Sequence, residues 1–169
     1  MQQNRFRLKR IVTLCAFGTA FVFTASAQSV ATTITEIPGS YTRDTTVTGA
    51  NGRTATYQDN ASNANGSYTD TRSVTGVNGK TATSSTTASR APGTTSRETT
   101  VTGFNGQSSS YENNRSWGNG TYTDSKSYTG VNGGTRTDTV SRGGGAVTNT
   151  VTGRNGNTRT YSRPVRFRR

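Results

Sequence analysis

The sequence predicts an all-β protein made of tandem 27-residue strand–turn–strand repeats that form an antiparallel meander of β-hairpins. The first observation behind this prediction is a Thr-Gly-x-Asn-Gly motif that occurs five times. Its first glycines stand at positions 49, 76, 103, 130 and 153, so the spacing is 27, 27, 27 and then 23 residues. A fixed period of this size is typical of an array in which one supersecondary unit packs against its neighbours.

The second observation is a further set of turn signals midway between these motifs: Asn65-Gly66, Ala91-Pro92-Gly93, Asn119-Gly120 and Gly143-Gly144-Gly145. Asn-Gly between alternating segments is the strongest short-range hairpin signal, because both positions tolerate positive φ. We therefore predict structural turn roles for the Asn-Gly pairs of the repeated motif, which are Asn51, Gly52, Asn78, Gly79, Asn105, Gly106, Asn132, Gly133, Asn155 and Gly156.

The third observation is the alternation of side chains between the turns. The turns delimit ten expected strands, at about 41–49, 53–61, 67–76, 80–89, 94–103, 107–116, 121–130, 134–142, 146–153 and 157–165. Within 67–76, hydroxyl side chains alternate with Tyr68, Asp70, Arg72 and Val74, and successive strand residues point to opposite faces. One face should therefore carry Thr and Ser, and the other Tyr, Val and paired charges.

The arrangement of these strands in space has two predicted solutions. Asn-Gly hairpin chemistry favours the meander, as an open sheet, a sandwich or a barrel. The three equal repeat intervals favour a β-solenoid, in which each unit is one coil. A weaker 54-residue period, in which Tyr57 matches Tyr111 and Tyr68 matches Tyr122, indicates that adjacent units alternate in type.

The chain after residue 27 contains no Leu and no Met, and its only isoleucines are Ile34 and Ile37, so its aliphatic content is mainly valine. Full burial of a large aliphatic side chain stabilises a fold by about 1.5–3 kcal/mol, whereas ordering one residue costs about 1–2 kcal/mol of backbone entropy. Either much of the chain is disordered, or inter-strand ladders and cross-strand pairs of Thr, Ser and Tyr hold it together.

The N-terminus has the pattern of a secretory signal peptide over residues 1–27. A basic segment is followed by an apolar segment, 11–24, and by Ala25-Ser26-Ala27 as a small-residue cleavage site. The apolar segment is shorter than the roughly 20 residues of a membrane-spanning helix, which speaks against the alternative of an uncleaved anchor. The exported chain should begin at Gln28, lack cysteine and have no transmembrane span.

Charge is unevenly distributed along the predicted mature chain. Removal of the signal takes away four basic residues and no acidic one, so the net charge falls from +12 to +8. We divide the rest into an N-terminal linker (28–40), a β-repeat domain (41–162) and a basic tail (163–169). From residue 139 onward there are seven arginines and no acid. We predict polyanion binding at Arg154, Arg159, Arg163, Arg166, Arg168 and Arg169.

Catalytic chemistry is not indicated by any residue pattern. The chain has no histidine, which excludes Ser-His-Asp and Cys-His arrangements and ordinary zinc or haem ligand sets. Asp70 and Asp124 occupy equivalent repeat positions beside Arg72 and Lys126, which predicts cross-strand ion pairing on the charged face. We therefore expect a non-enzymatic protein with no cofactor, no metal and no small-molecule substrate.

The leading functional hypothesis is a secreted structural or adhesive protein of the bacterial cell envelope or extracellular matrix, which self-associates through exposed strand edges. The repeats over residues 41–161 resemble, in architecture, bacterial functional amyloids of the curli type, in which strand–turn–strand repeats build an extracellular fibre. Curli-like repeats carry regularly placed Gln and Asn, where this chain has Thr and Ser. The expected location is extracellular or on the cell surface, with the periplasm as an alternative.

Two other functions follow from the surface chemistry. The C-terminal arginines would attract an anionic polysaccharide, lipopolysaccharide or nucleic acid, and the tyrosines could stack on sugars or bases. Regular Thr-x-Thr pairs resemble the ice-binding face of some β-helical antifreeze proteins, although Ser stands at 108 and 110. Those pairs are at 54 and 56, 81 and 83, 135 and 137, and 158 and 160.

Overall fold

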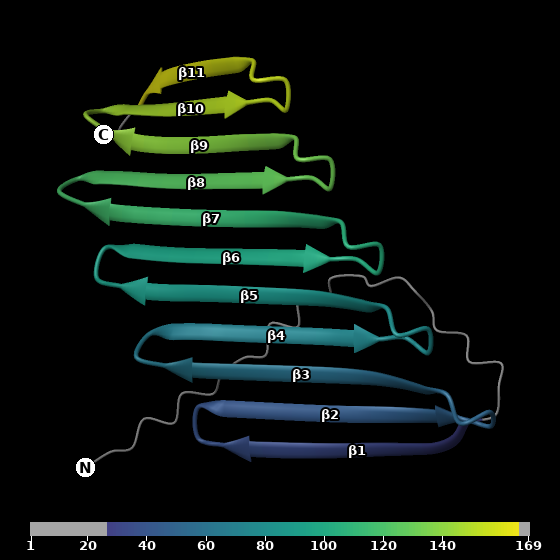
Figure 1. The fold of residues 1–169 in the computed structure, drawn as a ribbon. Coiled ribbons are helices and arrows are strands. Elements are labelled where there is room, and N and C mark those ends of the chain that lie inside the picture. Colours follow the sequence, from purple (N-terminus) through teal and green to yellow (C-terminus); the bar gives the residue numbers. More distant parts are fainter. Residues whose placement is uncertain (1–26, 166–169) are drawn as a thin grey trace, which may run out of the picture.

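Residues 27–165 form eleven antiparallel strands in one open sheet, in the order of the sequence (Figure 1). The computed structural model describes residues 27–165, so the predicted signal peptide lies almost entirely outside the described residues. The antiparallel hairpin meander is confirmed, and it neither closes into a barrel nor stacks into a sandwich or solenoid. The strands are β1 (Ala27–Ile37), β2 (Ser40–Gly49), β3 (Thr54–Ala64), β4 (Ser67–Thr75), β5 (Thr81–Ala91), β6 (Thr94–Thr102), β7 (Ser108–Gly118), β8 (Thr121–Thr129), β9 (Thr135–Gly143), β10 (Ala146–Thr152) and β11 (Thr158–Pro164).

The sheet begins earlier than the repeat predicted, and the expected boundary between the repeat domain and the tail falls inside its last strand. All ten expected strands are present, but residues 28–40, expected to be a linker, form β1 and the turn into β2. This segment lacks the Thr-Gly-x-Asn-Gly motif, yet it alternates like a strand and ends at Pro38-Gly39, where Gly39 has φ +82°. At the other end, Arg163 belongs to β11 rather than to a tail.

Two kinds of turn alternate along the meander. Two-residue turns lie on the left of Figure 1, and the five-residue turns of the repeated motif lie on the right. In the first five-residue turn, the Gly49 N–H donates to the Arg53 carbonyl (2.9 Å) and the Arg53 N–H donates to Asn51 Oδ1 (3.1 Å). Only the glycine of this Asn-Gly pair has positive φ (Gly52, +73°). Both residues have positive φ at Asn65-Gly66 and Asn119-Gly120, as in type I′ hairpins.

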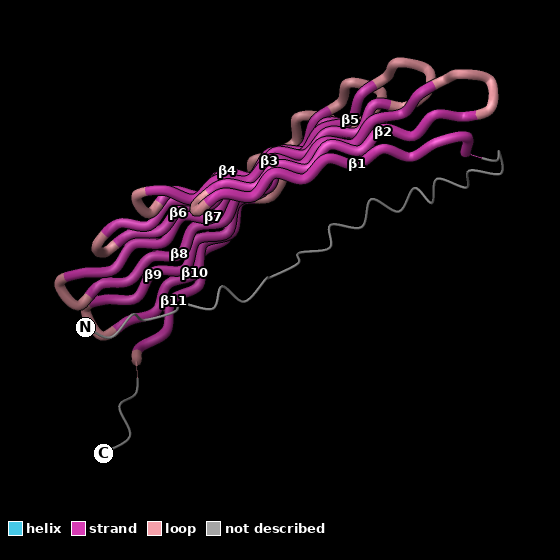
Figure 2. Tube along the Cα trace, turned by 90° about the horizontal axis from the view of Figure 1, so that it is seen from below, coloured by secondary structure: helices cyan, strands magenta, loops and turns pink. Residues whose placement is uncertain are grey.

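No second layer covers the sheet within the part of the chain that the structure describes. Figure 2, which looks along the direction in which the strands follow one another, shows the sheet edge-on as a single twisted layer. Ala82, at 2% exposed, is the one buried residue among those described. Cohesion therefore comes from the contacts between neighbouring strands, since a hydrophobic core is missing there.

The register assigns each face a different chemistry. Directly paired residues share a face, and the pairing aligns all seven tyrosines and Trp117 on one side, which we call the tyrosine face. The opposite side, the hydroxyl face, carries mainly Thr and Ser. The predicted alternation is thus confirmed. The tyrosines are Tyr41, Tyr57, Tyr68, Tyr111, Tyr122, Tyr128 and Tyr161.

Each of three two-residue turns is also tied to the strand beyond its own hairpin. The Asn63, Arg90 and Trp117 amides donate to the carbonyls of Gly39, Gly66 and Gly93, at 2.7, 2.9 and 2.8 Å. A Cβ at Gly66 would lie 2.7 Å from the Arg90 carbonyl oxygen, so only glycine fits this approach. These bonds join consecutive hairpins at one end of the sheet.

We predict that Gly66→Ala destabilises the sheet more than Gly79→Ala. Both glycines have positive φ (+75° and +73°), so both substitutions carry the left-handed penalty of roughly 1–2 kcal/mol. Only Gly66 adds a backbone clash, because nothing lies within 4 Å of a Cβ at Gly79. Thermal melts followed by far-ultraviolet circular dichroism should show the larger drop in Tm for Gly66→Ala. Equal drops would contradict the proposed role of the inter-hairpin contact.

Candidate functional site

The most ordered polar group on the tyrosine face surrounds Arg72 on β4. Its Nη2 lies 2.9 Å from Asp70 Oδ2 on the same strand, and its Nε lies 3.4 Å from Asp59 Oδ1 on β3. The Tyr68 hydroxyl donates to Asp70 (2.9 Å), and the Tyr57 hydroxyl donates to Asp59 (3.2 Å). Two carboxylates, each largely covered, are thus held between one guanidinium and two phenols. Asp70 therefore pairs with Arg72 of its own strand, and the ion pair across strands joins Arg72 to Asp59 instead of to Asp70.

This network changes the acidity of its phenols. Burial raises the pKa of Tyr57 above its ordinary value, and the neighbouring Asp59 carboxylate raises it further. Burial and the hydrogen bond to Asp70 raise the pKa of Tyr68 in the same way. Each phenol therefore keeps its proton and remains a donor to its carboxylate.

A related cluster lies 54 residues further along the chain. Asp124 on β8 pairs with Arg115 Nε at 3.5 Å and with Lys126 Nζ at 3.9 Å, and Tyr122 approaches it at 3.5 Å. Asn113 replaces the second aspartate and donates to Asp124 Oδ1 (2.6 Å). This cluster thus has two cations and one carboxylate, where the first has one cation and two carboxylates. The 54-residue period of the sequence therefore corresponds to two related charged clusters on the tyrosine face.

Arginine–aromatic contacts extend the tyrosine face towards its C-terminal end. The guanidinium of Arg142 lies 5.8 Å from the Tyr122 ring centroid, and that of Arg154 lies 5.6 Å from the Tyr128 ring. Arg43 makes the same contact with Tyr57 at 5.8 Å. Such geometry is attractive because the face of an aromatic ring carries negative potential. Rings and guanidinium groups are therefore interleaved on one surface.

The predicted polyanion-binding residues are partly brought together. Arg159 and Arg163 lie on the tyrosine face of β11, and Arg154 reaches that face from the turn before it. Arg166, Arg168 and Arg169 lie outside the described residues. The register adds Arg136 and Arg142 of β9 to the same face, and neither residue is among those predicted from the sequence. We call Arg136, Arg142, Arg154, Arg159 and Arg163 the arginine band.

The two faces differ in charge as well as in aromatic content. The strands place Asp44, Glu98 and Glu112 on the hydroxyl face with no Lys or Arg among the described residues. Their basic side chains are all on the tyrosine face, which carries ten of them against five acids. The ten are Arg43, Arg72, Arg90, Arg97, Arg115, Lys126, Arg136, Arg142, Arg159 and Arg163. This segregation of charge could have been predicted from the sequence, because successive residues of a strand point to opposite faces.

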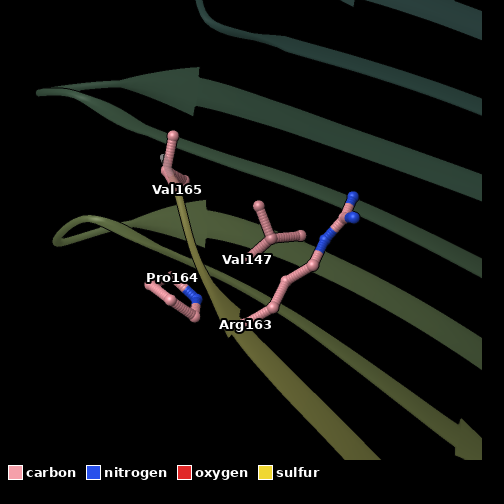
Figure 3. A pocket seen from close by; sticks show the side chains of 4 residues that line it. All are labelled: Val147, Arg163, Pro164 and Val165. Atoms are coloured by element: carbon pink, nitrogen blue, oxygen red, sulfur yellow. The ribbon is translucent and has the colours of Figure 1, made fainter. Parts of the chain in front are cut away.

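A shallow hollow lies at the end of the arginine band. Its lining consists of Val147, Arg163, Pro164 and Val165 (Figure 3). The Val165 N–H donates to the Gly145 carbonyl (2.7 Å), which fixes the chain as it leaves β11. In Figure 3 the Arg163 side chain extends away from Pro164 and Val165, so its guanidinium is available at the surface.

The hydroxyl face is organised by pairs beside the five-residue turns. The hydroxyls of Thr75 and Thr81 lie 2.8 Å apart, and those of Thr129 and Thr135 lie 2.9 Å apart. Thr152 and Thr158 repeat the contact at 2.8 Å. The predicted Thr-x-Thr pairs therefore lie on one face, with some of their hydroxyls bonded to each other.

Comparison of the chain with protein-family models, with curated proteins and with solved structures found no match. Among the described residues, no group of three or more Cys, Asp or Glu side chains is placed to hold a metal ion. The same residues include no helix of the length and hydropathy needed to cross a membrane.

We predict that the stability of the sheet falls as the pH rises through about 10 and above. The folded-state pKa values of Tyr57 and Tyr68 are raised above the ordinary 10.0, so the unfolded chain loses these protons first. The contribution of these two phenols to stability is therefore fully present below pH 10, and it is lost as the pH rises through their folded-state pKa values. Melting curves between about pH 9 and pH 11 should show a smaller loss of Tm for the double variant Tyr57→Phe/Tyr68→Phe than for the wild type.

Tyr161→Phe is the control, since it removes one phenol from β11 without touching Asp59 or Asp70. This variant should lose as much Tm at alkaline pH as the wild type does. If the double variant lost as much Tm at alkaline pH as the wild type, groups other than Tyr57 and Tyr68 would cause the loss.

Proposed function

We propose that this chain is a non-enzymatic, exported repeat protein that serves as a structural or adhesive component of a bacterial surface or matrix, with the tyrosine face as its contact surface. The observation that carries the proposal is an aromatic face without cover. Trp117, Tyr128 and Tyr161 are 42%, 43% and 61% exposed on a single-layer sheet. Large exposed apolar patches on a protein surface mark interaction sites.

The chemistry of this face suits an anionic polymer. Tyrosine and tryptophan rings stack on sugar rings or bases, and arginine guanidinium groups pair with carboxylates, sulfates or phosphates in bidentate geometry. The basic side chains of the face outnumber its acids two to one, and the arginine band contains a single acidic neighbour, Asp138. Anionic polysaccharide, lipopolysaccharide and nucleic acid are the proposed partners. A small-molecule substrate would need an enclosed site, which the flat sheet supports poorly.

Export remains a proposal that depends on the N-terminal pattern of residues 1–27. An extracellular, cell-surface or periplasmic location is consistent with a chain that, after Ala27, contains no cysteine to be oxidised. Ice binding through the hydroxyl face also stays a prediction, and a thermal-hysteresis measurement tests it.

We predict that Arg159→Gln/Arg163→Gln weakens heparin binding at least about tenfold and lowers its salt dependence, because two guanidinium contacts and their counterion release are lost. Heparin serves as the probe for an anionic polysaccharide. The matched control is Arg53→Gln/Lys80→Gln, which removes the same charge from two turns outside the arginine band. Isothermal titration at several salt concentrations should show the control close to the wild type.

Two outcomes would contradict the proposed site. Equal losses in both double variants would mean that net charge alone attracts heparin. Loss of binding only on deletion of residues 166–169 would place the contact in the C-terminal tail and not on the tyrosine face.

A further inference from the structure

The two outer strands of the sheet differ in how well they resist further pairing. An edge strand presents unpaired backbone groups, and natural sheets protect such edges with charges, proline or short strands. β11 has all three protections: seven residues, Arg159 and Arg163, and Pro164 at its end. β1 has eleven residues, and Glu36 is its one charged side chain.

The side chains of β1 favour pairing as well. Val30, Ile34 and Ile37 are 61%, 57% and 60% exposed, although they are among the few large aliphatic residues of the chain. Val30 and Ile34 point to the tyrosine face, where they pair with Val47 and Arg43 of β2. A β-branched, nearly uncharged strand of this length would be an aggregation hazard if it were left open.

We propose that β1 pairs with β1 of a second copy of this chain, antiparallel and about a two-fold axis at Thr32, to form one continuous sheet. Thr32 is the midpoint of Ser29–Thr35, which lies in the part of β1 that pairs with β2 without the register shift between Ala27 and Ser29. It places Val30 opposite Ile34 of the partner, and Ile34 opposite the partner's Val30. The Glu36 residues of the two copies lie at opposite ends of the seam, so no like charges face each other.

The register also preserves the faces of the sheet. Residues paired about Thr32 are both even-numbered or both odd-numbered, so the tyrosine faces of the two copies are continuous. A shift by one residue would place Val30 beside hydroxyl-face side chains of the partner. Shifts by an odd number of residues are therefore excluded, and of the remaining registers only the proposed one places Val30 opposite Ile34.

The main alternatives for self-association are less favourable. Pairing of β1 with β11 of another copy would bring Pro164, which has no N–H, to the seam and would align only seven residues. Stacking of two tyrosine faces would place two surfaces with excess positive charge against each other. In a closed two-fold dimer the unprotected β1 edges of the two copies pair with each other, and the protected β11 edges lie at the two outer ends of the joined sheet.

The test uses cysteine cross-linking in the full chain with Cys15→Ser, which removes the single native thiol. In the proposed seam Thr32 faces Thr32 of the partner subunit, with Cα atoms about 4.5–5.5 Å apart, a separation that a disulfide can span. Thr35 and its counterpart would be six positions apart along the seam, or about 20 Å. Both residues are exposed on β1.

We expect Thr32→Cys to form a disulfide-linked dimer under mild oxidation and Thr35→Cys to stay uncross-linked. Light scattering should show the mass of two chains for the reduced protein. Ile34→Lys should shift the dimer towards monomer at least about tenfold, because it places an unpaired charge in the seam. Tyr161→Lys, which adds the same charge at the β11 edge, should leave the dimer intact. Circular dichroism checks that both variants keep their strands.

A monomer at all concentrations would overturn the proposal, and so would equal cross-linking at residues 32 and 35. Growing oligomers that Tyr161→Lys disrupts would instead show β1–β11 pairing in an open fibre. The inference does not depend on polyanion binding, because cross-linking and heparin affinity are measured separately.

Discussion

The inter-strand hydrogen-bond ladder is the constraint on which the rest of this structure depends. In a globular domain a buried core contributes most of the stabilising free energy, but here Ala82 is the one buried residue among those described. Each ladder bond contributes about 0.5–1.5 kcal/mol net, and every interior strand of the sheet is paired on both sides. Cross-strand pairs such as Thr86 with Thr99 (3.0 Å) add to the ladder. The composition of the chain, rich in Thr and Val and without Leu after residue 27, suits a fold that depends on strand pairing.

A sheet that depends on pairing also needs its register fixed, and the turns supply this. In four of the turns of the repeated motif an Asn side chain accepts from the backbone two residues on, and in all five a glycine takes the positive φ. The four are Asn51, Asn78, Asn105 and Asn155. The two-residue turns set the register at the opposite end and are tied to the next hairpin at Gly39, Gly66 and Gly93. A slip of one residue would exchange tyrosines for hydroxyls in a whole strand. By fixing the register, the repeated glycines therefore keep the aromatic and basic side chains together on one face.

Much of this arrangement could be predicted from the sequence, and the remainder could not for identifiable reasons. Period and alternation predicted ten strands and the facing of Tyr68, Asp70 and Arg72. The same alternation fits an open sheet, a sandwich or a barrel, so the sequence left that choice open. β1 was missed because it has no Thr-Gly-x-Asn-Gly motif. Arg136 was missed because Asp138 interrupts the basic run in sequence, whereas the register places Arg136 opposite Tyr128.

The proposed dimer and the proposed contact surface fit together geometrically. The seam at β1 lies at one end of the sheet, and the arginine band on β9, β11 and the turn before β11 lies at the other end (Figure 1). In a two-fold dimer the bands therefore lie at the two far ends of one continuous tyrosine face, roughly 100 Å apart at about 4.8 Å per strand. A short ligand could contact one band only. A polymer long enough to reach both would gain avidity without any new contact, because its second attachment becomes intramolecular. The protected β11 edges would then be needed at the ends, so that the dimer stops growing while both bands remain accessible. This geometry favours a long, flexible anionic polymer over a small anion as the natural partner.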